Sequence, residues 1–413
     1  MSKRSPGRVT FVAAAFGLVS LAVLAASGSG APPPKDRAIQ GNLKPIETPY
    51  YIMNTDVPLD EAKEAAARMT AMAEEYFQRC QGFSSGTIHS KLPFYLFAKH
   101  DDYTGSGAPA GSAGVFMGNK LLADASHGVY TWHIVQHEGF HQFAASMISP
   151  RLPVWVNEGL AEYFGEAIWT GGGMVTGNIP MGRVKMVQEA IDKNELVPFE
   201  TMLSMSHATW NGQMKYSNYN QAFLMVTFLV QAQNGKYQQQ FANWIKDVAG
   251  GKDGQAAFAA RFGKDFEGFQ KRFSEWVKEI KDEDSAPLRI RAVMETLTCY
   301  LARAHCEGQD FDAVEDFFKA GEGAKVKIKN DIRWFLPPAL LAGDIKLARD
   351  MKGWTLENTK DGPRLTLQLP DGTVYTGTMA LDPKGPPTTK VTMESSKAAT
   401  KPADKADATT KPS

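Results

Sequence analysis

The chain has 413 residues, of which 43% are hydrophobic and 22% are charged, values typical of a globular protein with room for roughly two or three compact units. Its 45 Lys and Arg residues balance its 45 Asp and Glu residues, so the formal net charge is zero. That balance argues against nucleic acid as a partner, because nucleic-acid binding requires a strongly basic surface.

Residues 1–31 have the order of features found in an export signal. Basic residues precede a nearly unbroken apolar run from Phe11 to Ala26, and small residues follow up to Ala31. We expect cleavage near Ser27 or Gly28. An uncleaved membrane anchor is the alternative, because the run approaches the roughly 18 residues of a membrane span. The protein is therefore expected to be secreted, periplasmic or held at the cell envelope, and to touch the membrane only if this segment stays uncleaved.

Residues 32–45 are rich in proline and predict an exposed linker. Apolar residues then recur at helical spacing from Leu59 to Gln81, which predicts an amphipathic helix. The segment from Leu92 to Ala98 is typical of a strand, and the segment from Gly114 to Ala123 is typical of a strand or a strand pair. A small sheet is expected in this part of the chain.

From Val129 onward the chain is predicted to be mostly helical. The first two helices are expected at Val129–Met147 and Val156–Trp169, and a glycine cluster follows the second. Four later stretches carry an apolar stripe that we interpret as core: Val184–Ile191, Asn220–Ala232, Tyr237–Val248 and Phe266–Ile280. Residues 46–283 are expected to form one domain.

Three segments are expected after this domain. Residues 284–353 are predicted to be helical, and residues 354–382 to form a small antiparallel meander of three strands. Residues 383–413 are predicted to be disordered, since they consist mainly of Lys, Thr, Ala, Pro and Ser and have few apolar residues to bury. The predicted fold class is therefore α+β and mostly helical.

The sequence His-Glu-Gly-Phe-His, from His137 to His141, is the strongest chemical signal. Residues four apart lie on one face of a helix, about 5–6 Å from each other, so two imidazoles at this spacing can share one zinc ion. Glu138 projects beside the metal, where it can take a proton from a water whose pKa the zinc has lowered. The pattern predicts a zinc site with Glu138 as the general base.

A third ligand is required, and the next helix supplies two candidates. Glu158 follows His141 at a distance along the chain that lets the first helix end and a second return beside it. Glu162 lies four residues further on the same helix face, so either carboxylate could reach the metal.

His-Glu-x-x-His and the segment Trp-Val-Asn-Glu-Gly-Leu-Ala-Glu-Tyr-Phe, from Trp155 to Phe164, together resemble the gluzincin metallopeptidases. They are most similar to bacterial peptidase MA-like proteins, and the aminopeptidase branch shares the Asn-Glu-Gly-x-Ala element. The resemblance is strong over about residues 130–165 and looser over about 90–280. It implies a zincin-like fold, zinc as the cofactor, and peptides or proteins as substrates.

In the gluzincins the Glu of Asn-Glu-Gly is the third zinc ligand, so the resemblance implies His137, His141 and Glu158 as the metal ligands. It also implies that Glu162 is an outer carboxylate that holds a ligand imidazole through its other nitrogen. The Gly-Ala-Met-Glu-Asn strand of the aminopeptidases has no match in this chain. An exopeptidase of that branch is therefore not implied.

His133 precedes His137 by one helical turn and lines the same face. His133 and His141 are about 12 Å apart along the helix axis, so they cannot both bind one ion together with His137. We therefore interpret His133 as a packed or hydrogen-bonded helix residue.

A developing oxyanion requires a hydrogen-bond donor. Gluzincins supply a Tyr or His from a later helix, so the resemblance points to Tyr219, with Tyr216 and His207 as alternatives. It also suggests that the strand at Gly114–Ala123 is an exposed edge that pairs with an extended substrate. An interior strand of a small sheet is the alternative.

The resulting hypothesis is a secreted zinc metallopeptidase that hydrolyses peptide bonds by zinc-activated water, with Glu138 as the base. One alternative is a catalytically silent, zinc-containing cell-envelope module that binds a peptide or glycan in the same cleft. A purely structural envelope protein is the other. Turnover that is lost with a chelator favours the enzyme over the silent module, and about one zinc per chain excludes the structural protein.

Overall fold

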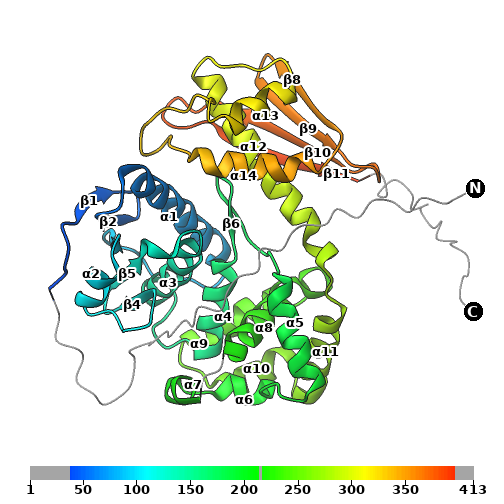
Figure 1. Cartoon of the computed structure of the whole chain (residues 1–413). Helices are drawn as coiled ribbons and strands as arrows, with labels where there is room; N and C mark the ends of the chain where they lie inside the picture. Colours follow the sequence, from blue (N-terminus) through cyan, green and yellow to red (C-terminus); the bar gives the residue numbers. More distant parts are fainter. Residues whose placement is uncertain (1–37, 214–215, 396–413) are drawn as a thin grey trace, which may run out of the picture. The chain divides into compact units, whose positions relative to one another are not determined.

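A computed structural model of the chain describes residues 38–213 and 216–395 (Figure 1). The predicted export signal at residues 1–31 lies outside the described residues, as does everything from residue 396 onward. Within the described ranges, none of the helices combines the length and the apolar character that a bilayer crossing requires.

The described chain divides into two compact units. The N-terminal unit consists of residues 38–292 together with residues 330–337. The C-terminal unit consists of residues 293–329 and 338–395. The chemistry predicted from the sequence lies in the N-terminal unit.

The N-terminal unit contains a mixed five-stranded sheet with the strand order β1-β2-β3-β5-β4. The strands β2 (Tyr51–Thr55), β3 (Leu92–Phe97) and β5 (Lys120–Asp124) run parallel. The edge strands β1 (Lys44–Glu47) and β4 (Gly114–Met117) are antiparallel to their neighbours. Both strand segments predicted from the sequence are confirmed, and the second is the hairpin of β4 and β5. β1 begins inside the segment predicted to be a linker, because its backbone pairs with β2.

The helix α1 (Leu59–Cys80) covers this sheet, as the spacing of its apolar residues predicts. Four of its alanines and Met69 belong to one buried core cluster with the sheet residues Phe94 and Leu96. The chain passes from β2 through α1 to β3, which allows these two strands to run parallel because a parallel pair requires a crossover connection.

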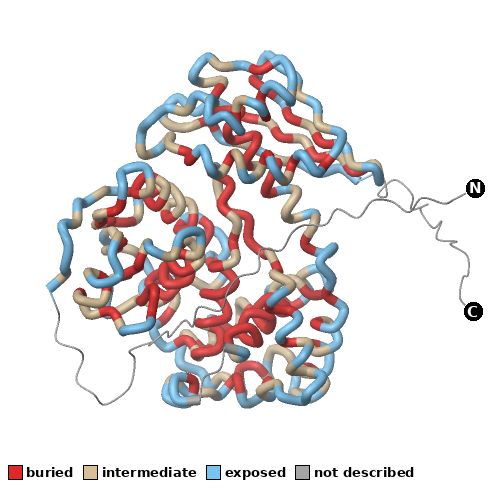
Figure 2. Tube along the Cα trace, viewed as in Figure 1, coloured by how far each residue is buried: buried red, intermediate tan, exposed pale blue. Residues whose placement is uncertain are grey.

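Two helices, α3 (Tyr130–Met147) and α4 (Val154–Gly165), form the centre of the N-terminal unit. α3 contacts α1, β4 and β5, and it also contacts α4. α4 in turn contacts α8 (Tyr216–Gly235), so it lies between two helices. Figure 2 shows most of α4 and α8 as buried, which explains why their apolar residues are not confined to one stripe.

The close packing of α4 against α8 depends on Gly159. A Cβ at this position would lie 2.5 Å from the carbonyl oxygen of Ala222 and 2.7 Å from Cγ2 of Val226, both in α8. Only glycine lets the two helix backbones approach this closely. The glycine of Asn-Glu-Gly therefore has a packing role.

Trp155 of α4 belongs to a buried aromatic core that also includes Phe199 and Trp244. The other helices of this unit are α2 (His100–Gly105), α5 (Met181–Asp192), α6 (Phe199–Ser204), α7 (His207–Gln213), α9 (Gln238–Ala249), α10 (Gly254–Phe262) and α11 (Phe266–Glu279). The four helical stretches predicted from their apolar stripes correspond to α5, α8, α9 and α11.

The C-terminal unit combines helices with one antiparallel sheet, whose strand order is β11-β10-β9-β8. The segment predicted to be helical contains three separate helices, which are α12 (Ala286–Cys306), α13 (Val314–Glu322) and α14 (Pro338–Arg349). The strands are β8 (Trp354–Thr359), β9 (Gly362–Gln368), β10 (Val374–Ala380) and β11 (Thr388–Glu394). The mostly helical α+β fold class is thus confirmed.

The helix predicted at Val156–Trp169 is too long. It ends at Gly165, and Ile168–Trp169 forms a short strand, β6, that pairs with β7 (Met174–Val175). The side-chain amide of Gln136 in α3 donates to the carbonyl oxygens of Phe164 and Gly165 at 3.1 Å. This tertiary contact satisfies the last turn of α4, and a local pattern does not reveal it.

The predicted disordered tail at 383–413 is wrong over Thr388–Glu394, which form the strand β11. This strand pairs with β10 along its whole length. Threonine and valine favour strands, and the neighbouring strand supplies hydrogen bonds that composition alone does not reveal.

Candidate metal centre

Two helices bring together the three residues that the sequence singled out as ligands. His137 and His141 lie one turn apart on α3, and Glu158 lies on α4. The Nε2 atoms of the two histidines are 3.1 Å apart. Glu158 Oε2 is 3.4 Å from His137 Nε2 and 3.5 Å from His141 Nε2. The three atoms therefore form a nearly regular triangle.

These distances fit a tetrahedral metal ion. Zinc bonds of about 2.0–2.1 Å at tetrahedral angles place ligand atoms about 3.3 Å from one another. Glu158 Oε2 is buried and has no hydrogen-bond partner among the described residues, an arrangement that is costly unless a cation satisfies the oxygen. Two imidazole nitrogens and one carboxylate oxygen are also the donor set of an open zinc site.

The charges of the group are coupled. Burial lowers the pKa of His141, but the Glu158 carboxylate outweighs this effect and raises the pKa to about 9. Burial raises the pKa of Glu158, yet the His141 and His137 rings outweigh it and hold the pKa at about 2. Glu158 is therefore ionised at neutral pH and attracts either a proton on a neighbouring ring or a metal cation.

Glu138 lies beside this group with its two oxygens in different situations. Oε2 accepts a hydrogen bond from the backbone N–H of Phe116 in β4 at 2.8 Å. Oε1 is buried and has no hydrogen-bond partner in the described part of the chain. A carboxylate with one anchored and one unengaged oxygen is suited to accept a proton from a water molecule.

The strand β4 can lie this close to α3 because its first residue is glycine. A Cβ at Gly114 would lie 2.3 Å from Cγ2 of Ile134 and 3.0 Å from Cγ of Glu138. The sequence left open whether Gly114–Ala123 is an exposed edge strand or an interior strand. In the structure β4 lies at the edge of the sheet and β5 lies in its interior, so each alternative holds for one arm of the hairpin.

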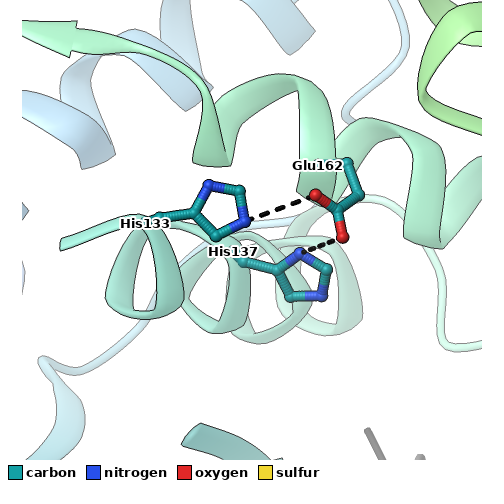
Figure 3. Close-up of side chains that lie close together, drawn as sticks. All are labelled: His133, His137 and Glu162. Carbon is teal, nitrogen blue, oxygen red and sulfur yellow. Dashed lines mark ion pairs between the residues drawn. The ribbon is translucent and has the colours of Figure 1, made fainter. Parts of the chain in front are cut away.

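One turn away from the ligands, Glu162 on α4 faces two histidines of α3 (Figure 3). Glu162 Oε1 is 3.6 Å from His137 Nδ1, and Glu162 Oε2 is 3.3 Å from His133 Nε2. Glu158 and Glu162 therefore face opposite nitrogens of the His137 ring. His133 is thus paired with a carboxylate of α4. This agrees with its interpretation from the sequence as a packed or hydrogen-bonded helix residue.

Among the candidate oxyanion donors, Tyr219 and His207 lie close enough to Glu158 for its charge to affect them. Burial raises the pKa of Tyr219, and Glu158 adds to the rise. Burial lowers the pKa of His207, and Glu158 opposes this effect. The Tyr219 hydroxyl is buried without a hydrogen-bond partner in the described ranges. The side chain of Tyr216 lies outside the described part of the chain.

Sequence reasoning missed Arg183 of α5, which contacts Glu162. Arg183 is buried and shares the inner face of its helix with Val184 and Val187. An arginine is rarely buried unless it is paired, so its place in an apolar stripe is a signal that could have been used.

Comparison with known protein families concerns the segment that carries these helices. Residues 124–279 match the Peptidase MA superfamily. The peptidase MA-like segment includes α3 and α4 and extends into α11, so the match confirms the resemblance drawn from the motifs and fits a zincin-like fold. This superfamily is generally zinc-dependent, which agrees with the His and Glu group on α3 and α4. No curated protein and no solved structure matches the chain.

Proposed function

We propose that the protein is a zinc metallopeptidase of gluzincin type. The observation that carries the proposal is the triangle of His137 Nε2, His141 Nε2 and Glu158 Oε2, with edges of 3.1, 3.4 and 3.5 Å, beside the unengaged oxygen of Glu138. These three residues would hold the metal, and the match to the Peptidase MA superfamily supports a peptidase-like activity.

A bound zinc ion supplies Lewis acidity, which polarises the substrate carbonyl and lowers the pKa of water at the site. Glu138 accepts the proton of the attacking water at Oε1 while the Phe116 N–H holds Oε2 in place. The same carboxyl group then returns the proton to the departing amine, which makes Glu138 base and acid in turn.

The edge strand β4 is the proposed binding surface for the substrate backbone. It lies at the end of the described sheet, next to α3, and its Phe116 N–H already reaches the base. An extended peptide can add to such an edge as a further strand, which places a scissile bond beside Glu138.

Tyr219 is the proposed donor to the developing oxyanion. Its hydroxyl is buried without a partner among the described residues, and the charge of Glu158 affects it. Because burial raises the pKa of Tyr219, the hydroxyl keeps its proton at neutral pH and can donate it in a hydrogen bond. The order of residues 1–31 supports export of the enzyme to the periplasm, envelope or medium.

The test is the substitution Glu138→Gln in the purified chain, with Glu189→Gln, an exposed glutamate of α5, as the matched control. We expect Glu138→Gln to keep about one zinc per chain. Its rate of casein hydrolysis should fall by about 10²–10⁴-fold, the usual contribution of general-base catalysis. Glu189→Gln should hydrolyse casein as the wild type does, and a chelator should abolish the activity of the wild type and of Glu189→Gln.

Retained casein hydrolysis in Glu138→Gln contradicts the role of Glu138. A wild-type protein that binds zinc but cleaves neither casein nor a peptide library supports the catalytically silent binding module. A wild-type protein that binds no zinc contradicts both the zinc peptidase and the zinc-containing binding module.

A further inference from the structure

A charged network extends from the metal centre to α5. Arg183 Nη2 is 2.5 Å from Glu162 Oε2, and Arg183 Nε is 2.8 Å from Glu166 Oε1. The third nitrogen, Nη1, donates a hydrogen bond to Asn220 Oδ1 in α8 at 3.0 Å. Arg183, Glu162 and Asn220 are buried. The guanidinium is therefore held at all three of its nitrogens by side chains of α4, of α8 and of Glu166, the residue that follows α4.

Glu162 transmits this geometry to the metal centre. Its Oε2 is bound by Arg183 and lies 3.3 Å from His133 Nε2, which leaves Oε1 facing His137 Nδ1 at 3.6 Å (Figure 3). A carboxylate that faces one ring nitrogen of a histidine favours the proton on that nitrogen and leaves the lone pair on the other. In His137 the other nitrogen is Nε2, the atom that faces Glu158.

The same side chains also have the composition of a second metal site. The ligand atoms of His133, His137 and Glu162 lie within 4.8 Å of one another. However, the oxygen of Glu162 that faces His133 is already bound by the Arg183 guanidinium, which is permanently charged. A metal cation there would meet this positive charge at short range in a buried region, where charges interact strongly. The group is better suited to orient His137 than to bind an ion.

We propose that Arg183 is a positioning residue of the metal centre, which acts through Glu162 to fix the orientation and tautomer of the His137 ring. The inference rests on the proposed function, because it takes His137 as a metal ligand. Glu166 and Asn220 hold the guanidinium in turn. Without Arg183, the Glu162 carboxylate can rotate, and its negative charge is no longer held 3.6 Å from His137 Nδ1. We expect zinc affinity to fall by about 10–100-fold, the usual effect of removing a group that orients a ligand.

The test measures zinc affinity of the metal-free full chain by competition with a chromophoric chelator. Arg183→Met, which keeps the length of the side chain but not its charge, should bind zinc about 10–100-fold more weakly than the wild type. Arg183→Lys should fall between them, because lysine keeps the charge but not the planar fork. Arg261→Met is the matched control, since Arg261 is paired with Asp247 at 2.8 Å and belongs to neither cluster.

Two further readouts separate positioning from general damage to the fold. Two-bond ¹H–¹⁵N spectra of the metal-free chain should show His137 as a single Nδ1–H tautomer in the wild type and as a mixture in Arg183→Met. The visible spectrum of the cobalt-substituted protein should change in the same variant. If Arg183→Met does not fold, Glu166→Gln, which releases one side of the guanidinium, should weaken zinc binding relative to the wild type and shift the spectra in the same direction.

Equal zinc affinity in wild type and Arg183→Met overturns the inference while leaving the proposed function intact. So does a loss of affinity with an unchanged His137 tautomer and cobalt spectrum, because it shows a purely structural effect. Two zinc ions per wild-type chain contradict the assignment of the His133 group. A wild type that binds no zinc contradicts the proposed function itself, and the inference fails with it.

Discussion

The two His and Glu groups on α3 and α4 use the same residue types at the same helical spacing, but their surroundings differ. No Lys or Arg of the described residues forms an ion pair with His137, His141 or Glu158, and Glu158 Oε2 has no hydrogen bond in the described structure. His133, His137 and Glu162 lie one turn away, and Arg183 binds the glutamate. One group can accept a cation, and the other is already neutralised.

This difference shows that ligand spacing alone does not define a metal site. A pair of histidines four residues apart and a nearby glutamate occur in both groups. What separates them is a side chain from a third helix, α5, that adds a fixed positive charge to one of them. We therefore expect substitutions within the two groups to have different effects on zinc binding.

The largest effect is expected from His137→Ala, because His137 belongs to both groups. The variant should bind less than about one tenth of a zinc per chain and have no measurable peptidase activity, since two ligands do not make a stable zinc site. Elemental analysis of the purified chain is the measurement. The matched variant His133→Ala should keep about one zinc per chain. If it loses zinc as completely as His137→Ala, His133 is a ligand and the comparison is wrong.

A smaller contrast is expected between the two glutamates. Glu158→Gln removes the charged ligand oxygen and should weaken zinc binding by more than about 100-fold. Glu162→Gln removes only an orienting group and should weaken it by about 10–100-fold. Chelator competition on both variants gives the ratio. The opposite order would mean that Glu162 is the third ligand.

A third contrast concerns a partly buried acid in the C-terminal unit. Burial raises the pKa of Asp344 to about 6, and a hydrogen bond from Thr296 only partly offsets this. Because the folded-state pKa exceeds the unfolded one, the native form binds more protons between about pH 4 and pH 6, and stability falls as the pH rises through that window. Asp344 therefore differs from Glu158 and Glu162, whose cationic neighbours keep them ionised.

Asp344→Asn should remove this penalty. The variant should match the wild type near pH 4 and be more stable by on the order of 1–3 kcal/mol at pH 7. Urea unfolding, monitored by hydrogen exchange of the α14 amides, measures the difference in the free energy of unfolding. Asp350→Asn, at an exposed position nearby, is the control. A constant difference from pH 4 to pH 7 would show that Asp344 is not the titrating group.

Local patterns predicted most of the elements that carry the site. The spacing of apolar residues located α1, α3, α5, α8, α9 and α11 but not the short helices α6, α7 and α10, and the hairpin of β4 and β5 followed from its strand-like segments. The errors fell where another part of the chain supplies the hydrogen bonds. Gln136 satisfies the end of α4, and β10 pairs with β11, so neither boundary is visible in its own segment.

For the candidate site, the sequence alone determined which side chains share a face of each helix, because the period of an α-helix is independent of context. Helical spacing therefore predicted the candidate site residues, which are His137, His141, Glu138 and the two glutamates of α4. Helical spacing did not distinguish Glu158 from Glu162, and the family resemblance favoured Glu158. The tertiary structure added that Glu158 Oε2 faces the Nε2 atoms of both ligand histidines, and it also set the position of β4 and the pairing of Arg183. These features depend on helix packing distances and on charges from segments distant in the chain, and in a buried region such contacts decide which group is left to bind a cation.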